Sequence, residues 1–474
     1  MSMLSPETIR KLPPLAGIAR LEEGFRAALS VEECVRRLKR FHYAFRRLHQ
    51  IFIWRLTSEP VYELKMAFSL HAHYCAEQVT QLRQRVGEMR EPPLGLDTIP
   101  HPALEIFFDE ILASPDTPGL LFGIYRSALP ALHEGLERYR RETHALADHP
   151  SVRVCRLALA DVEEMAEYGN AAWEACQQEA AHPDFEAWKA ILAGALCAAG
   201  GLDGTQPQAN MPARWHSRSP AVYDGTPKRD HRFPDPYNMG VNAELFLYDE
   251  SFPPAPKTLM MFYKRLREID VPEMMASILA ETTDKPWSYY RDMTRQLWDE
   301  ARHAMMGEIG FAAAGVDWPR VMVNFTWSLA LNTQLKPIER HAVLYFIEQG
   351  LMPKTGKRFE WEVGQASGNP LAALFQDFDW ADEVLHARIG RDWYLPAFPD
   401  PRTAVEYGDR CWSRVLMGWR EWKEQGLTQH RNWWPEIYLQ ACQHWKIEAD
   451  ARVLAYQTTY ESVRADLKNL SASS

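Results

Sequence analysis

Apolar residues recur at intervals of three and four positions from about residue 31 to residue 200, as in VEECVRRLKRFHYAFRRLHQIFIWRL. This spacing places apolar side chains on one face of an α-helix, so it predicts amphipathic helices that share a core. The same spacing resumes at about residue 257 and continues to about residue 393. The alternation of β-branched residues that is typical of strands is nearly absent. The pattern therefore predicts an all-α protein.

Turn-forming residues divide the chain into segments. The stretch between residues 200 and 257 is rich in Gly, Pro, Ser and Asn and lacks helical spacing, which predicts a linker packed on a surface. The expected domains are a helical bundle over 1–200, the linker over 201–256, a second bundle over 257–400 and a helical, tryptophan-rich tail over 401–474. The tail is expected to pack on a core or to form an oligomer contact such as a homodimer interface.

Shorter breaks predict where helices end within the two bundles. These breaks lie at residues 58–60, 91–102, 148–150, 284–286, 315–319 and 352–368. Four long helices in sequence before residue 200 suggest a bundle.

Composition narrows the classes of function. The 474 residues suffice for two or three domains. The net charge of −10 is unfavourable for binding nucleic acid, because no basic stripe offsets it. Seven cysteines without a C-x-x-C pair indicate reduced thiols. No signal peptide and no apolar run of about 18 residues is found, so we expect a cytoplasmic protein without a membrane segment.

A motif occurs twice in the second bundle. Residues 299–307 read DEARHAMMG and residues 382–390 read DEVLHARIG. Positions i and i+3 share a helix face, so each motif presents one carboxylate and one imidazole to the same point. A lone E-x-x-H is expected roughly once by chance in a chain of this composition, but two copies preceded by Asp are not. The pair therefore predicts a metal site on two facing helices.

Each motif needs a partner carboxylate on the helix before it. Glu348 lies 35 residues before Glu383, across the Gly- and Pro-containing break. Glu268 lies 32 residues before Glu300, at a distance that would bring these two level across a hairpin. Glu273 is the alternative to Glu268, since Pro272 could kink or restart the helix. With His303 and His386 these residues would complete the ligand set of a di-metal carboxylate bundle.

The aspartates and the glycines of the motif also have a physical explanation. Asp299 and Asp382 could each accept a hydrogen bond from the histidine of the opposite motif, which would fix the imidazole orientation. Gly307 and Gly390 stand one turn after each histidine and favour close helix packing over an opening beside the metals.

The motifs resemble those of the ferritin-like di-iron superfamily, which includes rubrerythrins, ribonucleotide reductase small subunits and di-iron oxygenases. The resemblance covers about 130 residues, 257–393, and implies a ferritin-like four-helix bundle. Carried onto this chain, it implies metal ligation by Glu268 (or Glu273), Glu300, His303, Glu348, Glu383 and His386. The first half resembles a degenerate second bundle in tandem, with Val162 and Met165 where Glu383 and His386 stand.

The resemblance implies an enzyme in which two iron ions, as Fe/Fe or Mn/Fe, activate O2 to oxidise a small organic substrate. Glu268, Glu300, Glu348 and Glu383 would act catalytically by changing between bridging and terminal coordination. A separate reductase or the substrate would supply electrons. The alternative is a metal-handling or peroxide-scavenging protein of the ferritin or rubrerythrin kind. A third is a scaffold with a buried polar network, which would be costly without a cation.

Overall fold

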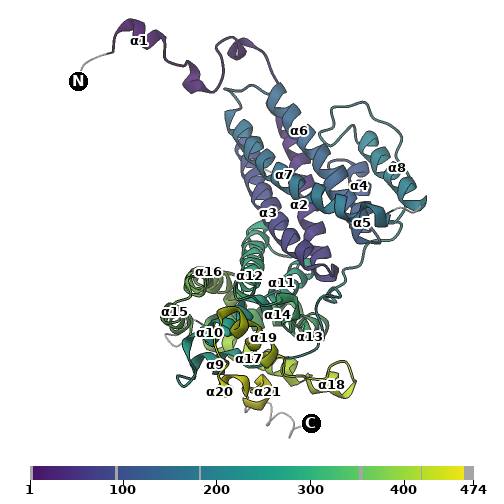
Figure 1. Cartoon of the computed structure of the whole chain (residues 1–474). Helices are drawn as coiled ribbons and strands as arrows, with labels where there is room; N and C mark the ends of the chain where they lie inside the picture. The colour runs from purple at the N-terminus through teal and green to yellow at the C-terminus, as the bar shows by residue number, and fades with distance from the viewer. Residues whose placement is uncertain (1–3, 91–93, 181–182, 352–355, 418, 464–474) are drawn as a thin grey trace. The chain divides into compact units, whose positions relative to one another are not determined.

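The computed structural model describes residues 4–90, 94–180, 183–351, 356–417 and 419–463, and all regular secondary structure in these ranges is helical (Figure 1). The chain forms two compact units, one of Met1–Ile51 with Tyr74–Val222 and the other of Phe52–His73 with Tyr223–Ser474. The expected linker over 201–256 is shared between them. Among the described residues, no helix has the length and apolar character needed to span a membrane.

The helices that precede the expected linker are α1 (Pro6–Arg10), α2 (Val31–Ser58), α3 (Tyr62–Met89), α4 (Pro102–Leu112), α5 (Thr117–Leu121), α6 (Leu129–Glu142), α7 (His149–Cys176) and α8 (Pro183–Ala198). Those that follow are α9 (Ala243–Tyr248), α10 (Pro254–Arg267), α11 (Asp270–Glu281), α12 (Trp287–Ala313), α13 (Thr326–Gln334), α14 (Pro337–Leu351), α15 (Lys357–Ala366), α16 (Pro370–Trp393), α17 (Pro401–Met417), α18 (Trp419–Glu424), α19 (Trp434–Trp445), α20 (Ala451–Leu454) and α21 (Tyr460–Val463).

In the first unit, parts of α2 and α3 pack with α6 and α7 (Figure 1). Phe41 of α2 meets Tyr139 of α6 edge to face, with ring centroids 6.0 Å apart. Gln78 of α3 donates to Asp161 of α7 at 2.6 Å. All groups of described side chains that could hold a metal ion lie in the second unit. The descent of the first unit from a duplicated metal domain stays a prediction.

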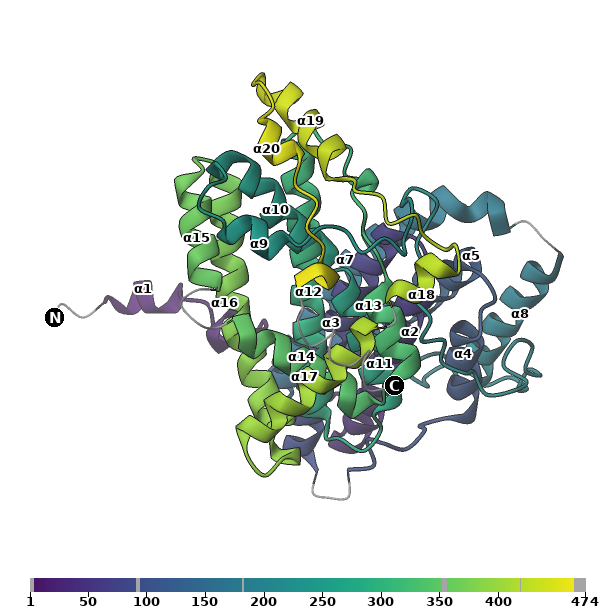
Figure 2. The same ribbon diagram turned by 90° about the horizontal axis from the view of Figure 1, so that it is seen from below.

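One expected break contains a helix. The range 352–368 was expected to be irregular, but α15 occupies Lys357–Ala366, and residues 352–355 lie outside the described part. Helix α15 packs along α16, as Figure 2 shows. Gly364 allows this approach, because a Cβ there would lie 3.1 Å from the backbone Cα of Ala373. Packing on a neighbouring helix thus stabilises a segment that turn-forming residues on both sides had marked as irregular.

The second unit is organised around α12. Helix α12 contacts α10, α11 and α16, while α14 contacts α11 and α16. The core of this unit includes Phe262 and Leu266 of α10 and Ala301 and Ala304 of α12, all fully or almost fully buried. Glu300 and His303 are thereby fixed between packed apolar neighbours on the same helix.

The expected linker and tail both contribute to this core. Phe233 and Val241, from the Gly- and Pro-rich stretch, are buried, as are Trp433 and Trp434 of the tail. These two tryptophans therefore pack within the second unit, which agrees with the expectation that the tail packs on a core. A homodimer contact stays a prediction.

Gly307 is required by the contact between α10 and α12. A Cβ at this position would lie 2.3 Å from the backbone nitrogen of Leu266 and 2.6 Å from the carbonyl oxygen of Phe262. Gly390 has a similar place on α16, where a Cβ would lie 2.3 Å from the ring of Tyr345. Both glycines of the repeated motif therefore serve close packing.

A Gly307→Ala variant is expected to lose about 1–3 kcal/mol of stability, because backbone atoms of α10 must move to admit the methyl group. Gly87→Ala is the matched control, since this helical glycine has only an ordinary 3.9 Å contact, with a side-chain atom of Leu94. The control should gain up to about 1 kcal/mol from helix propensity. Urea unfolding measures the free energy of unfolding of both variants, which should fall in Gly307→Ala and rise in Gly87→Ala. Equal changes in the two variants would contradict the prediction.

Candidate metal centre

Four helical segments of the second unit bring the predicted ligands together. The cluster consists of Glu268 directly after α10, Glu300 and His303 on α12, Glu348 on α14, and Glu383 and His386 on α16. The five residues on α12, α14 and α16 are buried, and the side chain of Glu268 is 16% exposed. Residues separated by more than 100 positions in the sequence thus form one polar cluster inside an apolar core.

Glu268 reaches the cluster because the chain breaks between α10 and α11. Helix α10 ends at Arg267, and α11 begins at Asp270. Pro272 lies in the first turn of α11, where its missing N–H costs no intrahelical hydrogen bond. The restart separates the directions of Glu268 and Glu273, so that only Glu268 joins the cluster.

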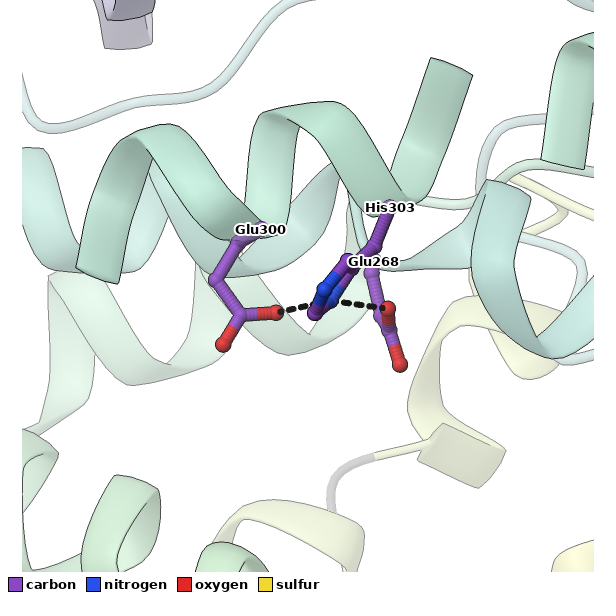
Figure 3. Close-up of side chains that lie close together, drawn as sticks. All are labelled: Glu268, Glu300 and His303. Carbon is purple, nitrogen blue, oxygen red and sulfur yellow. Dashed lines mark ion pairs between the residues drawn. The ribbon is translucent and has the colours of Figure 1, made fainter. Parts of the chain in front are cut away.

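The imidazole of His303 lies between two carboxylates (Figure 3). Its Nδ1 atom is 3.3 Å from Oε2 of Glu268 and 3.7 Å from Oε2 of Glu300. The three side chains offer ligand atoms that all lie within 4.8 Å of one another, so they could hold a metal ion.

His386 forms a second group of the same kind. Its Nδ1 atom is 3.2 Å from Oε1 of Glu300, and it is 3.8 Å both from Oε1 of Glu348 and from Oε2 of Glu383. The ring centroids of the two histidines are 6.0 Å apart. Glu300 therefore presents one oxygen to each imidazole, which is the arrangement that a carboxylate bridging two metal ions requires.

The structure places each motif aspartate against the histidine of the other motif. Nε2 of His303 is 3.1 Å from Oδ2 of Asp382, and Nε2 of His386 is 3.5 Å from Oδ2 of Asp299. The acceptor Asp382 keeps Nε2 of His303 protonated and leaves its Nδ1 to bind a metal, whereas Asp299 lies within ion-pair distance of His386 without a hydrogen bond to its Nε2. Arg302 donates to both aspartates, which holds the two acceptors in place.

An Asp382→Asn variant is expected to bind metal about 10–100-fold more weakly, because the amide is a poorer acceptor for His303 and can present its N–H₂ group instead. Asp377→Asn, on the exposed face of the same helix, is the matched control. Titration with Mn(II) checks the affinities. Equal binding by both variants would contradict a supporting role for Asp382.

The chemistry of the cluster fits a metal ion. Several fully buried atoms have no hydrogen-bond partner: Nδ1 of His303, Nδ1 of His386, and Oε2 of Glu268, Glu348 and Glu383. Buried polar atoms of folded proteins normally have a partner, and each unsatisfied one costs stability. These five atoms are also the ones that face the interior of the cluster, and a divalent cation would satisfy them together.

The spacing argument missed three charged residues of this site. Asp379, one turn before Glu383 on α16, joins His303 and Glu383 in a third group that could hold a metal ion. Arg265 contacts Asp379 and lies 2.8 Å from Glu268, while Lys357 lies 2.7 Å from Asp379. Asp379 was detectable from its i, i+4 spacing to Glu383. Nothing in the local sequence indicated Lys357 or Arg265.

The carboxylates of the cluster outnumber its lysine and arginine side chains. Its five carboxylates, Glu268, Glu300, Glu348, Asp379 and Glu383, face the cations Arg265 and Lys357. Burial raises the pKa of Glu348 well above its usual value, and the charge of Glu383 adds to this. Burial alone would also raise the pKa of Glu383, but Lys357 outweighs burial and lowers it strongly.

Both histidines respond to this negative charge. Burial alone would lower the pKa of His303, but Asp382, Glu268 and Glu300 outweigh burial and raise it to about 9. In the same way, Asp299 and Glu300 raise the pKa of His386 to about 10 against the effect of burial. Without metal, both imidazoles are therefore protonated at pH 7.

Metal binding at pH 7 is expected to release at least two protons, since a metal ion replaces the proton on each Nδ1 and the raised pKa of Glu348 favours a further proton on that ligand. The pKa values of both histidines are raised, so the imidazole protons are bound at pH 7 and are lost as the pH rises through 9 and 10. The apparent metal affinity should accordingly increase with pH over this range. Calorimetric titration in two buffers of different ionisation enthalpy measures the proton number, and identical heats would contradict the prediction.

Glu273, the alternative to Glu268, has cationic partners elsewhere in the second unit. Its carboxylate accepts from Lys65 at 2.7 Å and from Arg229, and it also accepts from the hydroxyl of Ser328 at 2.8 Å. Its side chain is completely buried. No described group of possible metal ligands includes Glu273, so its placement favours Glu268 as the first-helix candidate.

A cavity of about 100 Å³ adjoins the carboxylates. It is lined by the carboxylates of Glu268, Glu300, Glu348 and Glu383, by the further charged residues Glu244, Lys264, Arg265, Arg267 and Asp270, and by the apolar residues Val271, Met274, Leu331, Leu344, Ile347, Trp327 and Trp412. Neither histidine lines it. A small molecule in this cavity would contact the carboxylate side of the cluster and an apolar wall.

Comparison of the chain with models of protein families, with curated proteins and with solved structures finds no match.

Proposed function

We propose that this chain is a di-metal oxidase or oxygenase of the ferritin-like kind, which holds two iron ions, as Fe/Fe or Mn/Fe, and oxidises a small organic substrate with O2. The observation that carries the proposal is the sharing of Glu300 between two groups, each with its own histidine. Carboxylate and imidazole ligands suit iron and manganese. Two such ions, when bound, supply the redox chemistry that no side chain of the cluster can supply.

The residues of the chain have distinct tasks in this proposal. Glu268 with His303 and Glu348 with His386 would each bind one metal ion, while Glu300 and Glu383 would contact both. Asp382 and Asp299 orient the imidazoles through Nε2. The metal-binding bundle would then consist of the α10–α11 segment, α12, α14 and α16.

The neighbouring cavity supports an organic substrate. Its lining combines the apolar side chains of Val271, Leu344 and Ile347 with the carboxylates of Glu348 and Glu383. The basic residues of the lining are already paired: Arg267 with Glu244 at 2.7 Å, Arg265 with Glu268, and Lys264 with Glu360. A small, largely apolar substrate fits this lining best, with electrons from a separate reductase or from the substrate itself.

Oxidation of Fe(II) at increasing iron-to-protein ratios tests the proposal. The metal-free chain is loaded anaerobically with Fe(II) and mixed with O2, and O2 consumption and near-ultraviolet absorption are recorded. An oxidase or oxygenase without reductant should stop after about two iron ions per chain. Continued oxidation at many iron ions per chain would favour the ferritin-like alternative. Oxidation no faster than that of free Fe(II) would contradict both.

A further inference from the structure

Three residues before each copy of the repeated motif, the matching positions carry different side chains that face the cluster. Gln296 lies one turn before Glu300, and Asp379 lies one turn before Glu383, at the matching place in the repeat. Gln296 donates its amide N–H to Oε1 of Glu348 at 3.0 Å. Asp379 is completely buried and contributes a carboxylate instead. The side chain one turn before Glu300 is therefore neutral, whereas the side chain one turn before Glu383 is a carboxylate.

Lys357, together with Arg265 and Gln376, holds this additional carboxylate. It is the first residue of α15, and its side chain is 1% exposed. Its Nζ atom lies 2.9 Å and 2.7 Å from the two oxygens of Asp379 and 2.8 Å from Oε1 of Glu383. These two carboxylates and His303 form the third group that could hold a metal ion. The ammonium group thus binds oxygens that a metal ion beside His303 needs.

The contact affects the two histidines unequally. Oε2 of Glu383 points toward Nδ1 of His386, at 3.8 Å, and is not held by Lys357. A metal ion beside His386 therefore finds oxygens of Glu300 and Glu383 that Lys357 does not hold, and Oε2 of Glu348, whose Oε1 accepts from Gln296. A metal ion beside His303 finds Glu268 and Glu300, but the further oxygens near it, Oε1 of Glu383 and those of Asp379, are held by Lys357.

We propose that Lys357 sets unequal affinities at the two metal positions, because its ammonium group competes with the metal ion beside His303 for Asp379 and Glu383. The position beside His386 fills first, and the position beside His303 fills second and more weakly. This inference rests on the proposed function, since it assumes that the cluster binds two metal ions.

Titration of the metal-free chain with Mn(II), followed by the electron paramagnetic resonance signal of free Mn(II), tests the inference. The parent should bind in two steps whose dissociation constants differ by at least about tenfold, which corresponds to about 1.4 kcal/mol. In Lys357→Met the second step should tighten until the two constants differ by less than about threefold, while the first step stays unchanged. An unchanged or weaker second step in this variant would overturn the inference.

Lys65→Met is the matched control. Lys65 is also 1% exposed, but it pairs with Glu273, which belongs to none of the possible metal groups. Its loss removes an equally buried positive charge and should leave both steps unchanged. Equal tightening in both variants would overturn the assignment to Lys357, because a general change of charge would then explain it.

A measurement on the parent alone covers the case in which Lys357→Met does not fold. At one Mn(II) per chain the spectrum of the bound ion should be that of an isolated ion, and spin coupling between two ions should emerge only between one and two equivalents. Coupling at the lowest loading would overturn the inference, since both positions would then fill together. Absence of Mn(II) and Fe(II) binding in the parent would instead overturn the proposed function.

Discussion

Removing the metal ions with a chelator is expected to lower the stability of the second unit by at least about 4 kcal/mol, relative to protein in metal at 1,000 times the dissociation constant. The physical reason is that buried ligand atoms around Glu300, which include Nδ1 of both histidines and oxygens of Glu268, Glu348 and Glu383, have no hydrogen-bond partner until a metal ion binds them. Urea unfolding of metal-loaded and chelated protein, followed by tryptophan fluorescence, measures the difference.

Glu300→Ala is the control for this experiment, because Glu300 belongs to both histidine groups. The variant should unfold at the same urea concentration with and without the chelator. A parent chain that is equally stable in both conditions would contradict the metal site and favour a scaffold with a buried polar network.

The second large effect is expected outside the metal cluster, at Glu273. Glu273→Leu leaves Lys65 and Arg229 buried without this carboxylate and should cost about 3–5 kcal/mol. Metal content per folded chain should remain at the parent value, since Glu273 binds cationic side chains and not the cluster. Urea unfolding and metal analysis of the same preparation check the two results.

Glu406→Ala is the matched comparison for Glu273→Leu. Glu406 pairs with Arg402 one turn away, but both side chains are more than half exposed. An exposed pair contributes less than about 1 kcal/mol, so this variant should unfold almost as the parent does. A loss of metal in Glu273→Leu at unchanged stability would contradict the choice of Glu268 over Glu273.

Much of the helical framework follows from local sequence signals. The break at 284–286 separates α11, which ends at Glu281, from α12, which begins at Trp287. Proline marks these boundaries well because it removes a backbone donor. Helix α15 was missed, because it is held by packing of Gly364 against α16, and a contact between helices leaves no local signal.

The candidate site was likewise predictable where it depends on spacing within one helix, and not where it depends on contacts between helices. The i, i+3 spacing within the first motif was sufficient to bring Glu300 and His303 to a common point, whereas Glu383 groups with His303 of the other motif and His386 with Glu300. The choice between Glu268 and Glu273 depended on where α10 ends, which the sequence left open. Lys357 reaches the cluster from a helix that was not predicted, so its role required the structure.

The measurement that tests the central claim most directly is the metal content of purified chain expressed in medium supplemented with iron and manganese. The parent should contain about two metal ions per chain, and a Glu300→Ala/His386→Ala variant should lose them. Less than about 0.2 metal ion per chain in both proteins would contradict the di-metal site. The motifs DEARHAMMG and DEVLHARIG would then be a helix-packing repeat, as Gly307 and Gly390 alone would suggest.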